Sequence, residues 1–127
     1  METPYGKDKK FTVCLYELLG TATLMLSVVM TGGNALYVCF TLWAILMISG
    51  GITGGHFNPA VSTGVFIWRR KFESDFSLYA GMVISQFVGA LFGMLVGLLL
   101  LGNFTDDWYE NHPQGAVPEN WVPVFAP

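Results

Sequence analysis

The stretch of sequence that decides the fold reads Ser49-Gly-Gly-Ile-Thr-Gly-Gly-His-Phe-Asn-Pro-Ala-Val-Ser-Thr-Gly64. It places four glycines ahead of a histidine and an Asn-Pro-Ala triplet, between long apolar segments of the chain. Polar, irregular backbone is costly at membrane depth unless it is buried in protein or lines a water-filled path. The stretch therefore predicts a segment that dips into a membrane and lines a pore.

The remainder of the chain has the composition of a membrane protein. Of its 127 residues, 53% are hydrophobic and only 12% are charged, whereas a typical soluble domain has about 25% charged residues. Three apolar runs, at about 11–31, 35–51 and 76–101, are long enough, or nearly so, to cross a hydrocarbon core of about 30 Å. Buried helices of a soluble protein would need polar faces, which these runs almost entirely lack. We therefore predict an all-α transmembrane protein, integral to a lipid bilayer, with three membrane-spanning helices.

The basic residues predict the orientation of these spans. All six precede a span, in two clusters: Lys7, Lys9 and Lys10, and Arg69, Arg70 and Lys71. The positive-inside rule then predicts that the N-terminus lies on the cytoplasmic side and that the tail at 103–127 lies on the opposite side. This tail contains four prolines and no long apolar run, so we expect an extramembrane tail or connecting loop.

The segment between the second and third runs is predicted to contain a half-helix at about 59–69. Asn58 is a good N-cap, and Pro59 suits the first helical turn, where its missing N–H would be unpaired anyway. Eleven residues make a helix roughly 16 Å long, about half of a bilayer. The expected re-entrant half-helix has its N-terminus near the midplane, where Asn58 can donate to a passing water and the positive helix end opposes cations. A plain cap on an interfacial helix is the alternative that Asn-Pro-Ala alone would favour.

Three separate motifs resemble those of the major intrinsic proteins, the aquaporins and glycerol facilitators. The first signature loop of that family is matched by Gly54, His56, Asn58, Pro59, Ala60 and Val61. Glu17-Leu-Leu-Gly-Thr21 is similar to the first span of the family, and Ser85-Gln-Phe-Val-Gly-Ala90 is similar to its third span. The likeness is collinear over residues 11 to about 102. It implies an aquaporin-like first repeat at 1–102.

The resemblance assigns expected roles to individual residues. Asn58 is expected to be the pore-lining donor, His56 to line the inner vestibule, and Val38 to occupy a filter position that is often aromatic in the family. The pore loop is expected to be shaped by Gly54, Gly55, Pro59, Ala60 and Val61. Glu17 and Gln86 are expected to be buried supports that hold the loop without touching the permeant.

Small residues recur at every fourth position of the third span: Gly81, Ser85, Gly89, Gly93 and Gly97. This pattern lets membrane helices approach closely. It predicts a tightly packed neighbour, which is either another span of the same fold or a partner chain.

The family builds its pore from two inverted repeats, and this sequence carries one of the two signature loops. We therefore expect half of a channel for passive permeation of water or small neutral solutes, completed by a second half from another polypeptide, an inverted copy or a longer form of the chain. One-sided charge argues against the inverted copy. The alternative is a non-conducting accessory subunit among other membrane subunits. The resemblance also implies an oligomer, which is a tetramer in the family.

Other classes of function have little support in the sequence. Two histidines, no metal-ligand spacing, no nucleophile elbow and no phosphate-binding glycine motif argue against an enzyme. We expect no cofactor and no metal site. A net charge of −3 without a basic patch argues against a nucleic-acid partner.

Overall fold

The computed structural model describes residues 7–101, which form four α-helices. The elements are α1 (Lys7–Met30), α2 (Ala35–Thr53), α3 (Pro59–Arg69) and α4 (Phe72–Leu101). The part of the chain that the structure describes contains no strand, which confirms the predicted all-α fold. The predicted extramembrane tail at 103–127 lies outside the described residues.

Three of the helices, α1, α2 and α4, are long and apolar enough to cross a membrane. The chain is therefore an integral membrane protein. Helix α4 begins at Phe72, ahead of the apolar run at about 76–101, and its first turn contains Glu73 and Asp75. Hydropathy excludes these acids from a span, but acidic side chains suit the positive N-terminal end of a helix.

Helices α1 and α4 make the most extensive contact in the fold, and glycines on α4 allow it. A Cβ atom added to Gly89 would overlap the carbonyl oxygen of Leu18, and one added to Gly93 would overlap the carbonyl oxygen of Ala22. The backbones of the two helices therefore touch where α4 has no side chain. The close neighbour predicted from the small-residue pattern is α1 of the same chain.

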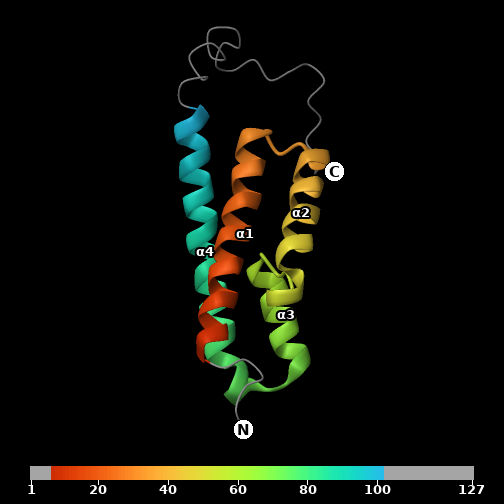
Figure 1. Ribbon diagram of the computed structural model, residues 1–127, viewed down its shortest axis with the longest axis vertical. Helices are drawn as coiled ribbons and strands as arrows, with labels where there is room; N and C mark the ends of the chain where they lie inside the picture. Colours follow the sequence, from red (N-terminus) through yellow and green to blue (C-terminus); the bar gives the residue numbers. More distant parts are fainter. Residues whose placement is uncertain (1–6, 102–127) are drawn as a thin grey trace, which may run out of the picture.

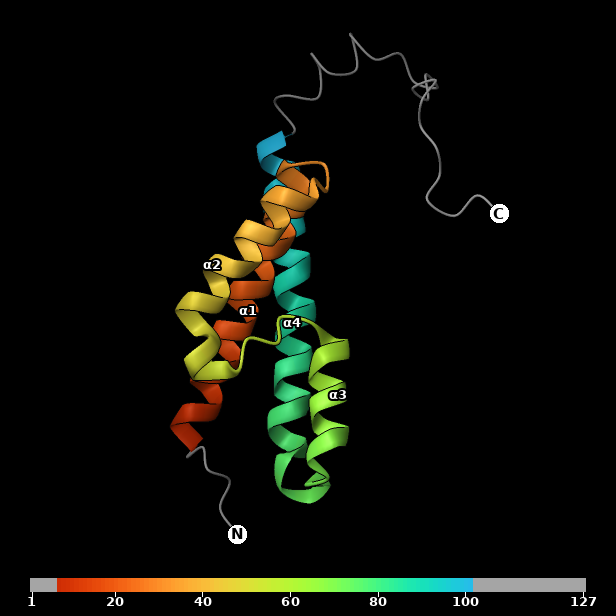
Figure 2. The ribbon, with the colours of Figure 1, turned by 90° about the vertical axis from the view of Figure 1, so that its right-hand side faces the viewer.

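The short helix α3 packs on the first half of α4. The rings of Phe66 and Tyr79 stack with centroids 4.3 Å apart and planes 6° apart. The Tyr79 hydroxyl also lies 3.0 Å from Thr63 Oγ1. Figures 1 and 2 show that α3 begins near mid-height of the bundle and descends to the end where α4 starts. Its eleven residues thus cover only the lower half of α4.

Helix α2 packs mainly against α1 and presents most of its surface outward. Of its nineteen residues, only Ile45 and Ser49 are buried. Thr41 Oγ1 donates to Ser27 Oγ of α1 at 2.9 Å, a polar contact between the two helices. The outward surface of α2 is apolar and requires lipid or another protein segment to cover it.

The start of α1 and the junction between α3 and α4 lie at the same end of the bundle (Figure 1). A hydrogen bond joins them there, because Lys10 Nζ donates to Ser77 Oγ at 2.8 Å. The basic residues Arg69, Arg70 and Lys71 belong to this junction. The two basic clusters of the sequence therefore share one end of the molecule.

Candidate pore-loop site

The loop between α2 and α3 runs from Gly54 to Asn58 and is built on left-handed backbone. Gly54 ends α2 with a φ of 87°, and its N–H donates to the Gly50 carbonyl at 3.0 Å. Gly55 follows with a φ of 68°, and a Cβ atom there would overlap the side chain of Leu46. Both positions therefore require glycine. The loop is shorter than its glycine content suggests, because Gly50 and Gly51 belong to α2.

Phe57 anchors the loop to α1. Phe57 is only 3% exposed, and its ring lies on Gly20, where an added Cβ atom would overlap the ring. Its φ of 45° is unusual for a bulky residue, and such backbone persists only where the surroundings fix it. This role was not predicted from the sequence, because an apolar residue in a loop does not reveal which helix it packs against.

Glu17 of α1 holds the loop backbone through its side chain. Oε1 accepts from the N–H of His56 at 3.1 Å, and Oε2 accepts from the N–H of Phe57 at 2.7 Å. Glu17 is fully buried. Buried carboxylates require such donors, and here two of them are backbone groups of the loop itself. The acid is therefore tied to the loop backbone by two hydrogen bonds.

Gln86 of α4 extends this network to α3. Its Nε2 donates to Glu17 Oε2 at 2.8 Å and to Ser62 Oγ at 2.9 Å, while Ser62 Oγ lies 3.0 Å from His56 Nδ1. Glu17 only accepts in this arrangement, so Gln86 must turn its NH₂ group toward it. Because Gln86 uses its second N–H on Ser62, the hydroxyl hydrogen of Ser62 is available to His56.

The network thus joins one residue from each of three helices to the loop histidine. Gln86, like Glu17, is fully buried, and Ser62 is 3% exposed. The sequence indicated Glu17 and Gln86 as supports but did not single out Ser62. The only available signal was its spacing, which puts Ser62 one helical turn after Asn58 and lets its N–H donate to the Asn58 carbonyl at 3.0 Å.

Asn58 caps α3 and keeps a hydrogen-bond donor free. Its backbone is extended, and its Oδ1 accepts from the N–H of Ala60 at 2.8 Å, with Pro59 in the first turn. The Asn58 residue is exposed. Within residues 7–101, no partner is recorded for its Nδ2 group. Because Oδ1 is engaged at the helix end, the NH₂ group is the part of the side chain that remains available as a donor.

The remaining predicted site residues lie apart from this network. Val61 is 45% exposed on the first turn of α3. Val38 lies in the first turn of α2, with its N–H donating to the Asn34 carbonyl at 3.1 Å. That turn is at the opposite end of α2 from the loop (Figure 1). The structure therefore brings together Glu17, Gln86 and His56, and it separates Val38 from them.

An open groove of about 190 Å³ lies between α1 and α2. Its lining combines aliphatic side chains with three hydroxyl-bearing residues: Tyr16, Leu19, Gly20, Thr23, Ile45, Ile48 and Ser49. Two of these hydroxyls form hydrogen bonds within their own helices. Thr23 donates to the Leu19 carbonyl at 2.8 Å, and Ser49 donates to the Ile45 carbonyl at 2.5 Å. No cluster of three metal-ligating side chains occurs among the residues that the structure describes.

Three spanning helices with a short helix that starts at mid-height define a multi-pass membrane protein with a re-entrant segment. Polar loops of this kind occur where backbone lines a cavity or is buried in protein. Residues 11–125 match the family model of the major intrinsic proteins. The chain belongs to this family, as its three motifs indicated.

The names of curated relatives agree with this assignment. The chain is 38% identical over 85 residues to glycerol uptake facilitator protein-like 6 of Lactiplantibacillus plantarum, covering 61% of this chain and 38% of the relative. It is 34% identical over 97 residues to aquaporin-8 of Mus musculus, covering 68% of this chain and 34% of the relative. With aquaporin PIP2-5 of Oryza sativa subsp. japonica it shares 31% identity over 75 residues, 59% of this chain and 24% of that protein.

In each case the match spans well under half the length of the relative. No solved structure matches this chain significantly.

Proposed function

We propose that the chain forms one half of a membrane channel for passive permeation of water or small neutral solutes. The observation that carries this proposal is the free NH₂ group of Asn58 at the N-terminal end of α3. A permeant oxygen accepts from this group while the loop network holds Asn58 in place. The names of the relatives, which include both aquaporins and a glycerol uptake facilitator, support water and small neutral solutes as the class of permeant.

The electrostatics of α3 favour neutral permeants. The N-terminus of a helix carries a partial positive charge from its unpaired N–H groups. Asn58 Oδ1 satisfies only one of these groups, that of Ala60. A cation that reaches Asn58 therefore meets a positive helix end, whereas a water molecule finds a donor that orients it.

The exposed surfaces of the chain support the need for a second half. Asn58, Ala60 and Val61 are exposed at the start of α3, and a polar helix end that faces lipid is costly. Transporter and channel folds built from inverted repeats place the site at the interface between the halves. A second half, from a further segment of a longer polypeptide or from another chain, covers α3 and the outward side of α2. The complete pore then assembles as an oligomer of the kind found in the family.

The shared basic end supports an orientation in the membrane. Lys9 and Lys10 of α1 lie at the same end as Arg69 and Arg70 of the α3–α4 junction. The positive-inside rule assigns this end to the cytoplasmic side. Since both clusters lie on one side, an inverted second copy of the same chain would oppose the rule.

The test substitutes Asn58→Asp in the complete assembly, with Asn34→Asp as the matched control. Asn34 caps α2 in the same way, with Oδ1 accepting from the N–H of Leu36 at 3.1 Å, but it lies far from the loop. Both substitutions keep an oxygen that caps the helix. Only Asn58→Asp removes the free donor and adds a negative charge in the proposed path. Loss of one hydrogen bond of about 1 kcal/mol predicts about a fivefold fall in water permeability.

Stopped-flow swelling of proteoliposomes measures water permeability, and electrical recording measures cation leakage. We expect Asn58→Asp to lower the first and raise the second, with Asn34→Asp unchanged and both variants assembled normally by size-exclusion chromatography. Equal effects of the two substitutions would contradict the proposal. Wild-type protein that conducts nothing, in a complex with unrelated membrane subunits, would favour the accessory role instead.

A further inference from the structure

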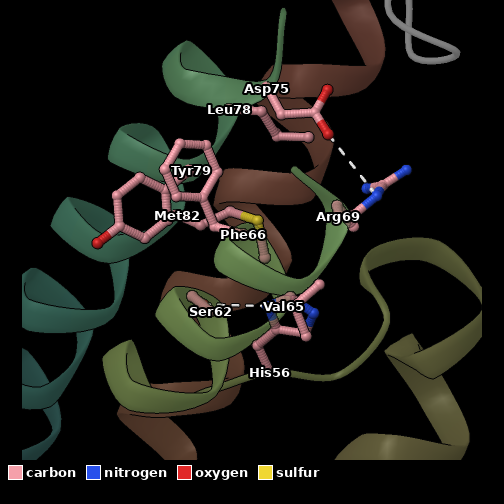
Figure 3. A pocket seen from close by; sticks show the side chains of 9 residues that line it. All are labelled: His56, Ser62, Val65, Phe66, Arg69, Asp75, Leu78, Tyr79 and Met82. Carbon is pink, nitrogen blue, oxygen red and sulfur yellow. Dashed lines mark hydrogen bonds and ion pairs between the residues drawn. The ribbon is translucent and has the colours of Figure 1, made fainter. Parts of the chain in front are cut away.

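A small cavity lies between α3 and the first turns of α4, on the side of α3 that packs against α4 (Figure 3). Its volume is about 40 Å³. Apolar side chains form its middle, and polar groups stand at both ends. The lining residues are His56, Ser62, Val65, Phe66, Arg69, Asp75, Leu78, Tyr79 and Met82.

Asp75 places a buried acceptor at this cavity without a donor to satisfy it. The residue is 8% exposed, and Oδ1 accepts from Ser74 Oγ at 3.1 Å. Oδ2 is buried and has no hydrogen-bond partner within the described residues. The nearest cation, Arg69 Nε, lies 3.6 Å away, which is too long for a hydrogen bond. An unsatisfied buried acceptor costs about 1–3 kcal/mol, so Oδ2 favours a ligand that can donate a hydrogen bond to it.

The volume and charge of the cavity identify the class of ligand. A cavity of about 40 Å³ has room for at most about three to four water molecules, since each needs roughly 10–15 Å³ on this measure. The Asp75 carboxylate already faces the Arg69 guanidinium, so a cation at Oδ2 would meet a like charge. Water satisfies both the small volume and the charge of the site. It is small and neutral, and it can donate to Oδ2 while accepting from Arg69.

We propose that this partly open cavity holds a bound water, which donates to the buried Asp75 Oδ2 and bridges it to Arg69. His56 and Ser62 stand at the other end of the same cavity (Figure 3). The bound water therefore lies at the basic end of the cavity, and apolar side chains such as Phe66 and Met82 separate it from the polar network of the loop. The site depends only on the packing of α3 on α4, and it is independent of whether the channel conducts.

X-ray radiolytic footprinting with mass spectrometry tests the proposal on the wild-type protein in its native assembly. Radiolysis of a bound water forms hydroxyl radicals that oxidise side chains beside it. Met82 is the probe, because its thioether is readily oxidised and it lines the cavity while only 5% exposed. We expect Met82 to be oxidised in wild type and its rate to fall several-fold in Asp75→Leu, which removes the acceptor and fills space.

Two variants serve as controls for this experiment. Asp75→Asn keeps an oxygen acceptor and is expected to keep the oxidation of Met82, whereas Glu73→Leu removes an exposed carboxylate from the same helix turn and is expected to leave the rate unchanged. A Met82 that is not oxidised in wild type, or that oxidises equally in Asp75→Leu, overturns the proposal.

If Asp75→Leu does not assemble, a high-resolution density map of the wild-type protein decides the matter. A density peak at a hydrogen-bonding distance of about 2.5–3.2 Å from Asp75 Oδ2 supports the water site. An empty cavity in that map overturns it. Neither result bears on Asn58, so failure of the water site and failure of the channel proposal remain distinguishable.

Discussion

Replacement of Glu17 by leucine removes the acceptor of three hydrogen bonds at once. Those from the N–H groups of His56 and Phe57 and from Gln86 Nε2 measure 3.1, 2.7 and 2.8 Å. Each donor left buried and unpaired costs about 1–3 kcal/mol, which gives a gross loss of about 3–9 kcal/mol. Removing the carboxylate also removes its own desolvation penalty of several kcal/mol. We therefore expect a net loss of about 2–5 kcal/mol in the free energy of unfolding.

Glu17→Gln provides a graded second point. The glutamine amide has one oxygen where the carboxylate has two, and the two loop N–H groups bond to different oxygens of Glu17. In either orientation of the amide, at least one of these N–H groups faces an NH₂ group and loses its acceptor. The expected loss is about 1–3 kcal/mol, smaller than for leucine.

The assay is equilibrium unfolding of the assembled protein in mild detergent, titrated with SDS and followed by tryptophan fluorescence. Glu73→Leu is the control, because Glu73 is an exposed acid in the first turn of α4. It is expected to change stability by no more than about 1 kcal/mol. If Glu17→Leu unfolds at the same midpoint as Glu73→Leu, the view of Glu17 as the anchor of the loop is refuted.

Two further predictions concern glycines. Gly93→Ala is expected to destabilise the protein by about 1–3 kcal/mol, because the added methyl group overlaps the Ala22 carbonyl. The control Gly51→Ala, whose methyl group would meet no atom within 4 Å, is expected to stabilise the protein by about 0.5–1 kcal/mol through helix propensity. The same SDS titration measures both variants, and equal effects would contradict the close α1–α4 contact. Gly20→Ala is expected to displace the ring of Phe57, and to lower water permeability more than it lowers stability. Unchanged swelling rates would show that Phe57 does not set the loop position.

The sequence predicted α3 closely because its end signals are local. An asparagine cap and a proline in the first turn mark its start at Pro59, and Arg69 is its last residue. Helix α4 begins ahead of the apolar run at about 76–101, because an apolar run stops at charged residues while a helix can include them in its first turn. The resemblance also indicated Glu17 and Gln86, since a buried acid and a buried amide stand out in apolar spans.

Other parts of the site depend on tertiary neighbours that sequence patterns do not reveal. Phe57 adopts a left-handed conformation only because its ring fits over Gly20 on α1. Ser62 gains its place from Gln86, 24 residues later in the chain. In the sequence, Asp75 is an ordinary acidic residue in the first turn of a helix. Only the packing of α3 shows that one of its oxygens lacks a hydrogen-bond donor. Local signals thus specify the helices, while the hydrogen bonds between them require the assembled fold.

The span of the Glu17 network along the chain has a consequence for biosynthesis. Glu17 enters the membrane with α1, whereas its partners follow 39, 40 and 69 residues later. At about 5–20 residues per second, Gln86 is made roughly 3–14 s after Glu17. During that interval α1 carries an acid with none of its final donors, which is costly in hydrocarbon. The nascent helix is therefore expected to remain at the insertion machinery until the loop and α4 arrive, so that integration of the first span waits for the third.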